Sequence, residues 1–226
     1  MSREGKDLKS TPIIIADSSD ETSLAEMAKQ AKVILNAVGP YRLYGEVVVK
    51  AAVENGASHV DISGEPAFLE KMQMLYGEKA KEKGVYVVGA CGWDSIPCDM
   101  GVNFVKEHFD GDVNHVETFV QMNSGSFGLF KRAGPTKEQM EEASFTYWFF
   151  AYGYSDRKPL EEQHNGKPDQ KMVVTCKGPD AGYMATKVVS SQRHQHLPKL
   201  SSIHTLNHSV SHFKWKLRRD ISRWCS

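Results

Sequence analysis

The sequence predicts an α/β protein whose core is a doubly wound parallel sheet. Short β-branched runs recur through the first half of the 226 residues, and each is followed by a segment of helical periodicity. The connecting turns contain Gly, Pro, Asn and Ser, which end strands and begin helices. Alternating strands and helices joined by right-handed crossovers form a parallel sheet with helices on its faces.

The expected elements follow one another from residue 12 to residue 109. Short apolar runs predict strands over residues 12–17, 33–37, 58–62 and 85–89. The segments between and after them predict helices over residues 23–30, 45–54, 67–83 and 99–109. Ser23 and Glu26 have capping-box spacing at the start of the first helix, and Gly84 is a stop signal for the third.

The turn after the strand at 33–37 is the expected centre of a ligand site. Gly39 permits close approach of the backbone to a bound group, and Pro40 stops the strand. The helix beyond is expected to offer free N–H groups to an anion or to a polar edge of a cofactor. In open parallel sheets ligands bind at this edge. A purely structural strand-to-helix turn is the alternative.

Composition and charge exclude several classes of protein. Apolar residues make up 40% and charged residues 25%, as in ordinary globular proteins, and the formal net charge of zero does not indicate a nucleic-acid partner. No run reaches the roughly 18 apolar residues of a membrane helix. No apolar stretch follows the charged residues 1–7, so the sequence predicts no secretory signal. We expect a soluble or peripheral intracellular protein.

Cysteine and histidine spacing predicts no metal site. Cys91 and Cys98 do not fit a zinc pattern, and the loop between them contains no basic residue, so buried reduced thiols are expected. His204, His208 and His212 recur every four residues, as ligands on one helical face would. Because no cysteine and a single carboxylate lie near them, a polar tail is the favoured interpretation.

Several longer motifs carry a family resemblance. They occur in the right order, at residues 38–45, 55–65, 92–99, 134–136, 143–146 and 177–186. In these motifs the chain resembles the saccharopine dehydrogenase-like oxidoreductases, which are related to bacterial trans-acting enoyl reductases. The resemblance is continuous from about residue 6 to residue 123 and resumes from about residue 131 to residue 199.

This resemblance implies an NAD(P)-dependent oxidoreductase of lipid or glycolipid metabolism, with a small or lipid-related substrate. It implies a Rossmann-like dinucleotide-binding domain over residues 1–110 and part of a substrate or dimerisation domain over residues 111–199. Residues 200–226 form an atypical polar tail, expected to be disordered or loosely helical. Association with lipid droplets, mitochondria or membranes, and homodimer formation, are further implications.

The chain also departs from the family pattern in three places. No Gly-x-Gly-x-x-Gly turn occurs in the sequence, so the first βαβ unit with its pyrophosphate site is expected to be absent. Residues 124–130 run directly into Lys131, where family members carry a long apolar segment. The tail differs as well. The simplest account is a truncated or alternatively spliced product, or an incorrect gene model. The chain as written is expected to bind NAD(H) or NADP(H) weakly or not at all. The alternative function is a non-catalytic protein that binds lipid droplets, membranes or a partner subunit.

The resemblance places the cofactor contacts at two strand ends. Asp17 closes the first predicted strand and is a candidate contact for the adenine amino group, although it could equally cap the next helix. Backbone atoms at the end of the next strand would lie along the ribose and the nicotinamide, and Tyr41 would wall that pocket unless it packs in the core. The predicted cofactor-binding residues are Asp17, Asn36, Val38, Gly39 and Tyr41.

The candidate catalytic groups lie after the next two predicted strands. Asp61, Ser63 and Glu65 put three polar groups at one carboxyl edge, where Glu65 could orient substrate or act as a general acid or base. Helix capping by Ser63 and Glu65 is the alternative. Asp94 follows the last predicted strand, where the cofactor domain meets the substrate domain, with helix capping as its competitor. Glu65 and Asp94 are the predicted catalytic residues.

Overall fold

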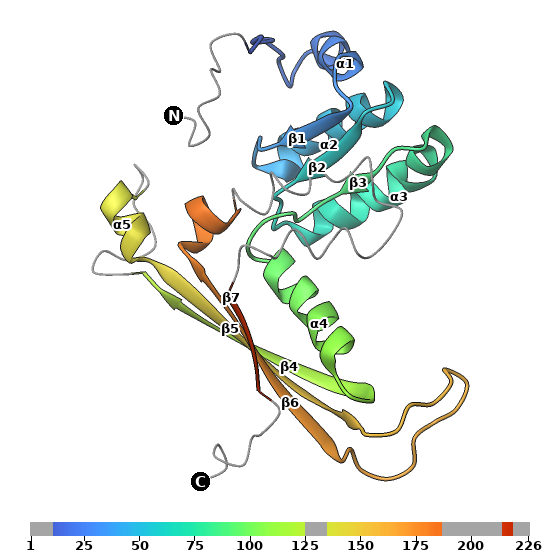
Figure 1. The fold of residues 1–226 in the computed structure, drawn as a ribbon. Helices are drawn as coiled ribbons and strands as arrows, with labels where there is room; N and C mark the ends of the chain where they lie inside the picture. The colour runs from blue at the N-terminus through green and yellow to red at the C-terminus, as the bar shows by residue number, and fades with distance from the viewer. Residues whose placement is uncertain (1–10, 125–134, 187–213, 219–226) are drawn as a thin grey trace. The chain divides into compact units, whose positions relative to one another are not determined.

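The computed structural model describes residues 11–124, 135–186 and 214–218 (Figure 1). The chain divides into two compact units. The first contains Met1–His59 and Glu65–Val87, and the second contains Val60–Gly64 and Val88–Ser226.

The first sheet of the chain is parallel and has three strands, in the order β1 (Val33–Asn36), β2 (Ser58–Asp61), β3 (Val87–Val88). Three helices alternate with these strands: α1 (Glu21–Lys29), α2 (Tyr41–Glu54) and α3 (Pro66–Lys83). This alternation confirms the predicted α/β class.

Two apolar clusters hold the helices of the first unit in place. Ile34 of β1 is buried with residues of α1 and α2, among them Leu24 and Val48. A second cluster joins α2 to α3 through Tyr41 and Phe68, whose ring centroids are 5.6 Å apart. Gly45 permits this approach, because a Cβ there would lie 2.6 Å from the Phe68 ring.

The strand predicted over residues 12–17 is wrong. The segment is irregular, and the side chains of Ile13 and Ile15 are each 92% exposed. A strand needs a neighbour to satisfy its backbone groups, and the described part of the chain provides none for this segment. Local β propensity therefore does not produce a strand here.

Three helices begin earlier than predicted. The first starts at Glu21, because Asp20 is its N-cap and accepts a bond from the Thr22 N–H at 2.9 Å. Helix α2 starts at Tyr41, directly after Pro40. Helix α4 (Ile96–His108) starts at Ile96 and has a proline in its first turn, a position where the missing N–H carries no cost.

The second unit is built on a four-stranded antiparallel sheet. Its order is β4 (Asp112–Asn123), β5 (Ser144–Tyr154), β6 (Gln170–Pro179), β7 (Lys214–Arg218). Helix α4 packs on one face, where Gly101 makes room for the Phe149 ring. Two short helical segments, α5 (Lys137–Glu142) and a π-helical turn at Ala181–Ala185, complete the unit.

The prediction of a disordered or loosely helical tail is wrong for Lys214–Arg218. These residues pair with Val173–Lys177 as the antiparallel strand β7. The alternation of polar and apolar residues in this segment suits a strand at the sheet edge. The remaining tail residues, including His204, His208 and His212, lie outside the described residues.

Candidate functional site

The turn between β1 and α2 is fixed by its own polar groups. The Asn36 Oδ1 accepts a hydrogen bond from the Val38 N–H at 3.0 Å, and the Tyr41 hydroxyl donates to the Asn36 carbonyl at 3.0 Å. The Gly39-Pro40 peptide bond is cis. Tyr41 is buried, so it is part of the core as well as a support of the turn.

The side-chain N–H donor of Asn36 has no hydrogen-bond partner among the described residues. The Asn36 side chain is 3% exposed, so this Nδ2 donor is buried. A buried donor without a partner costs free energy, about 1–3 kcal/mol, unless a ligand or water accepts from it. The Asn36 Nδ2 is thus a donor available to an oxygen of a bound molecule, and Val38 beside it is half-exposed.

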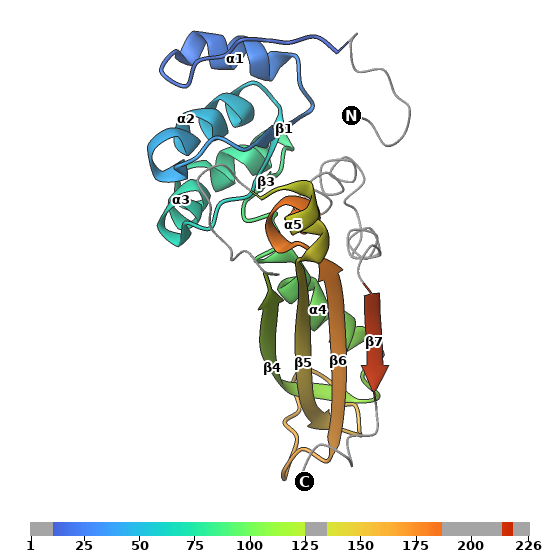
Figure 2. The same ribbon diagram turned by 90° about the vertical axis from the view of Figure 1, so that its left-hand side faces the viewer.

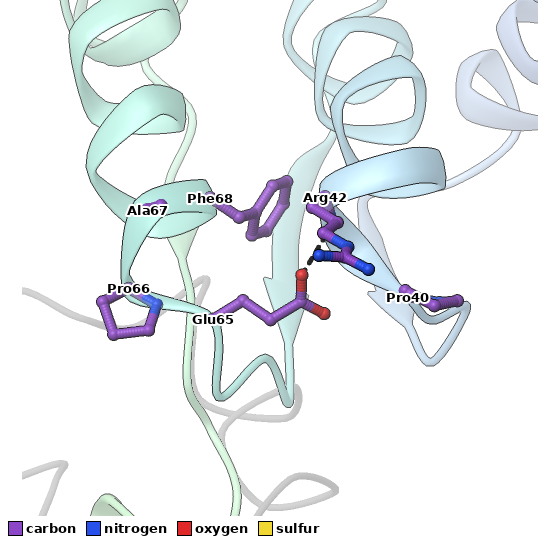
Figure 3. A pocket seen from close by; sticks show the side chains of 6 residues that line it. All are labelled: Pro40, Arg42, Glu65, Pro66, Ala67 and Phe68. Atoms are coloured by element: carbon purple, nitrogen blue, oxygen red, sulfur yellow. Dashed lines mark hydrogen bonds between the residues drawn. The ribbon is translucent and has the colours of Figure 1, made fainter.

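Glu65 occupies the start of α2. From the N-cap position of α3, its Oε1 accepts from the Tyr41 N–H at 2.8 Å and its Oε2 accepts from the Arg42 N–H at 2.9 Å (Figure 3). The expectation that this helix offers free N–H groups to an anion is therefore wrong. A carboxylate from the chain itself already interacts with the positive end of the helix.

A pocket of about 450 Å³ opens beside this carboxylate (Figure 3). Its lining is mostly apolar, and Arg42 and Glu65 contribute one cation and one anion. The pocket is lined by Pro40, Arg42, Glu65, Pro66, Ala67 and Phe68. It has the mixed character of a small-ligand site.

Asp61 holds the end of β2 to the turn after β3. Its Oδ1 accepts from the Ser63 N–H at 2.9 Å and from the Ala90 N–H at 3.0 Å, and the Cys91 N–H donates to its carbonyl at 2.7 Å. Ala90 has φ of 54°, a left-handed conformation that these bonds stabilise. Burial raises the pKa of Asp61, and the two N–H bonds oppose this shift. Asp61 and Ser63 are 2% exposed, so they stabilise the turn.

The loop after β3 carries the second predicted catalytic group. Asp94 is exposed and has no hydrogen-bond partner among the described residues, while the N-cap of α4 is Ser95. The Trp93 N–H donates to the Thr186 Oγ1 at 3.1 Å, and the indole packs on Phe145 at 5.2 Å between ring centroids. The structure thus leaves the Asp94 carboxylate accessible to a bound molecule.

Tyr147 lies beside the same loop. Its ring centroid is 5.8 Å from that of Trp93. Burial, with smaller effects from Cys98 and Asp94, raises the pKa of the Tyr147 phenol far above its ordinary value of 10. The Trp93 Nε1 is buried and has no partner in the described part of the chain.

Asp17 lies outside these turns. Its Oδ1 accepts from both the Ser19 N–H at 2.8 Å and the Ser19 hydroxyl at 2.7 Å, which lower the pKa of the carboxyl. Asp20, two residues beyond Ser18, is the cap of α1. The predicted role of Asp17 as a helix cap is therefore wrong, and its contact with adenine stays a prediction.

Sequence reasoning missed two contributors to the site. Arg42 supplies the cation of the pocket and Phe68 its apolar wall. A cation in the first turn after a Gly-Pro strand end could have indicated Arg42. No local pattern marks Phe68, because its place depends on the packing of α3 against α2.

The described ranges contain no group of three or more His, Cys, Asp or Glu side chains placed to hold a metal ion. None of their helices has the length and apolar character needed to cross a membrane. Cys91, Cys98 and Cys176 are free thiols. The prediction of buried thiols is confirmed for Cys91, which is buried like Cys176, and is wrong for Cys98, which is half-buried.

Comparison with known proteins identifies the class of the first unit. Residues 5–88 match the saccharopine dehydrogenase NADP binding domain. The parallel sheet, the turn after β1 at its carboxyl edge and this match together define a dehydrogenase-type protein with an NADP-binding domain.

Relatives that align with most of the chain then identify the family. The lipid droplet localized protein of Caenorhabditis elegans is 39% identical over 318 aligned residues, which cover 81% of this chain and 75% of that protein. The saccharopine dehydrogenase-like oxidoreductase of Homo sapiens is 48% identical over 153 residues, or 68% of this chain and 33% of that protein. The chain belongs to the family of saccharopine dehydrogenase-like oxidoreductases, which confirms the resemblance seen in its motifs.

A plant relative shows the same partial coverage. A probable mitochondrial saccharopine dehydrogenase-like oxidoreductase of Arabidopsis thaliana is 34% identical over 180 residues, 76% of this chain and 36% of that protein. The chain spans about a third of the human and plant relatives. The alignment with the nematode protein, 318 residues, is longer than the chain itself, so that relative has residues without a counterpart here.

Proposed function

We propose that this chain carries the nicotinamide side of the cofactor site of an NAD(P)(H)-dependent oxidoreductase with a lipid-related substrate. The unpartnered, buried Nδ2 of Asn36 is the observation that carries this proposal. A bound nicotinamide cofactor would supply the hydride. The names of the nematode and plant relatives support a place at lipid droplets or in mitochondria.

The residues of the turn after β1 would each do a separate task. Asn36 would donate to the cofactor, and the backbone at Val38 and Gly39 would lie along the ribose and the nicotinamide. Tyr41 fixes the Asn36 carbonyl, and Glu65 fixes the start of α2. These bonds orient the turn.

Asp94 is the proposed general acid or base of the second unit. Its carboxylate is exposed, whereas those of Asp61 and Glu65 already accept two backbone N–H bonds each. A group that moves a proton must reach the substrate by a hydrogen bond, and Asp94 is free to do so. Direct catalysis by Glu65 stays a prediction.

A titration with NADPH and NADH, followed by the fluorescence of the reduced nicotinamide, tests the cofactor site. We expect weak binding, above the low-micromolar range, that Asn36→Asp weakens further. This variant retains an oxygen for the Val38 N–H, loses the donor and adds a carboxylate, a change of charge that the control variant below also makes. Asn55→Asp, at the end of α2, is the matched control. Equal binding by Asn36→Asp and the native chain would contradict the proposal.

A second candidate function is a non-catalytic, lipid-associated or subunit-binding protein. One observation favours it: Glu65 occupies the helix N-terminus that could have bound a phosphate. Its expected result in the same titration is the absence of dinucleotide binding by the native chain. In that case a homodimer or a complex with an intact family member would be the species to isolate.

A further inference from the structure

The antiparallel sheet of the second unit has two unlike faces. Side chains of β5 alternate between them, so Phe145, Tyr147 and Phe149 are buried towards α4, while Trp148 and Phe150 lie half-buried on the opposite face. Figures 1 and 2 show α4 on one side of this sheet. We call the side opposite α4 the open face; its central residues are His115, Glu117, Phe119, Gln121, Thr146, Trp148, Phe150, Tyr152, Lys171, Val173, Thr175, Lys177 and Lys216.

Aromatic rings form the middle of the open face. The register sets Phe119 opposite Trp148, and the Phe119 and Phe150 rings meet edge to face at 5.7 Å. Phe119 is 56% exposed, although it is a large apolar side chain. Tyr152 continues the row, with the Lys171 Nζ 5.5 Å from its ring centroid. Phe119 is exposed, the rings of Trp148, Phe150 and Tyr152 are half-buried, and Val173 beside them is buried. A row of partly exposed aromatic rings of this kind indicates an interaction surface.

Basic side chains accompany the rings. Lys171 lies opposite Tyr152, Lys177 opposite Thr146, and Lys216 opposite Thr175, and all three are exposed. Among the residues that define the open face, Glu117 is the one carboxylate, and its Oε1 is 3.4 Å from the His115 Nε2. The open face is therefore locally positive and aromatic, although the net charge of the whole chain is zero.

We propose that the open face docks on an anionic phospholipid surface. Aromatic side chains favour the boundary between headgroups and acyl chains, and lysines are attracted to anionic headgroups. The strand register places both kinds of side chain on the same face of the sheet. A second copy of the chain would instead bring an equally positive face against the first. The choice of lipid rests on the lipid-related function proposed above, and the vesicle measurement below requires neither cofactor nor substrate.

Vesicle flotation with the purified full chain tests this surface. We expect binding to phosphatidylcholine vesicles that contain phosphatidylserine, weaker binding to phosphatidylcholine alone, and release by salt. A lysine near an anionic surface contributes about fivefold to the binding constant. Removal of all three lysine charges should thus weaken binding about a hundredfold. The combined variant Lys171→Glu, Lys177→Glu, Lys216→Glu, which also adds repulsion, should lose at least that much, and Phe119→Ala should bind more weakly at every salt concentration.

Lys106→Glu is the matched control, because it reverses an exposed lysine on α4, which covers the other face. A milder triple variant to Gln replaces the triple reversal if the reversal lowers the melting temperature.

Equal vesicle binding by the native chain and the folded triple variant would overturn the proposal, as would salt-independent binding. Loss of an oligomer by Phe119→Ala without a change in vesicle binding, or face-dependent binding of single-stranded RNA without vesicle binding, would also overturn it. Loss of NADPH binding with vesicle binding intact would contradict only the proposed function.

Discussion

Two turns at the carboxyl ends of parallel strands differ in what they leave to a ligand. After β1, Glu65 occupies the backbone N–H groups of the helix, and the buried Nδ2 of Asn36 has no partner in the described part of the chain. After β3, Asp61 fixes Ala90, and the exposed Asp94 is left without a described partner. Each turn thus has one carboxylate that accepts two backbone N–H bonds and one polar group available to a ligand. A position at a strand end alone does not make a carboxylate reactive.

Removal of Asp61 should have the largest effect, because it leaves the buried Ser63 N–H and the half-buried Ala90 N–H without their acceptor. We expect Asp61→Ala to lower the free energy of unfolding by about 3 kcal/mol, measured by urea denaturation. Asp61→Asn retains the Oδ1 acceptor and should lose less. Equal losses in the two variants would show that the charge of Asp61, rather than its hydrogen bonds, stabilises the turn.

The same carboxyl predicts a pH dependence. Burial raises the pKa of Asp61 above its ordinary value of 3.8, so the folded state retains the proton longer than the unfolded state. Stability should therefore fall as the pH rises from 3.8 through the folded-state pKa. Asp61→Asn should remove this fall when urea denaturation is repeated across the acidic range. An unchanged pH profile in the variant would contradict the assignment.

His59, on the same strand, should have the opposite pH dependence. Burial lowers its pKa from 6.5 to about 4, so the unfolded state takes up the proton first. The protein should lose about 3 kcal/mol of stability as the pH falls from 6.5 to about 4. The His59 ring resonances in an NMR titration measure this directly. Titration near pH 6.5 in the folded protein would show that the strand is hydrated at this point.

Glu65 provides a test of the first turn. Glu65→Ala removes the acceptor for two N–H groups at the start of α2, and we expect a loss of about 1 kcal/mol, as is usual for a lost helix cap. Glu65→Gln keeps one acceptor oxygen and should lose about half as much. Glu70→Ala, an exposed glutamate on α3, is the control. A loss no larger than that of the control would mean that the carboxylate is not needed to hold α2.

The sequence predicted the elements whose own residues specify them. The β1 strand, α2, β2 and α3 were expected within a few residues, because periodicity and Gly or Pro signals lie inside each segment. The strand at residues 12–17 failed because a strand also needs a neighbour, and β7 was missed because its partner β6 is distant in the chain. The candidate site at the strand ends stays a prediction, and the two N–H bonds of Glu65 link residues 24 and 23 positions apart, which no local pattern encodes.

Asp94 should have the smallest effect on stability and a large one on turnover. Its side chain is exposed and makes no described hydrogen bond, so Asp94→Asn should change the free energy of unfolding by less than about 0.5 kcal/mol. In an active full-length form, the same change should lower turnover by about a hundredfold. Glu65→Gln is the companion variant, and we expect it to lower turnover less. Native turnover in Asp94→Asn would exclude it as the acid or base.

The central claim is that the turn after β1 binds the nicotinamide side of the cofactor. An NMR titration of the labelled chain with two halves of NADP, nicotinamide mononucleotide and adenosine 2′,5′-bisphosphate, tests it most directly. We predict that nicotinamide mononucleotide shifts the Asn36 side-chain amide and the Val38 and Gly39 N–H signals, while adenosine bisphosphate leaves them unchanged. Shifts of these signals by adenosine bisphosphate alone, or by neither fragment at saturating concentration, would contradict the claim.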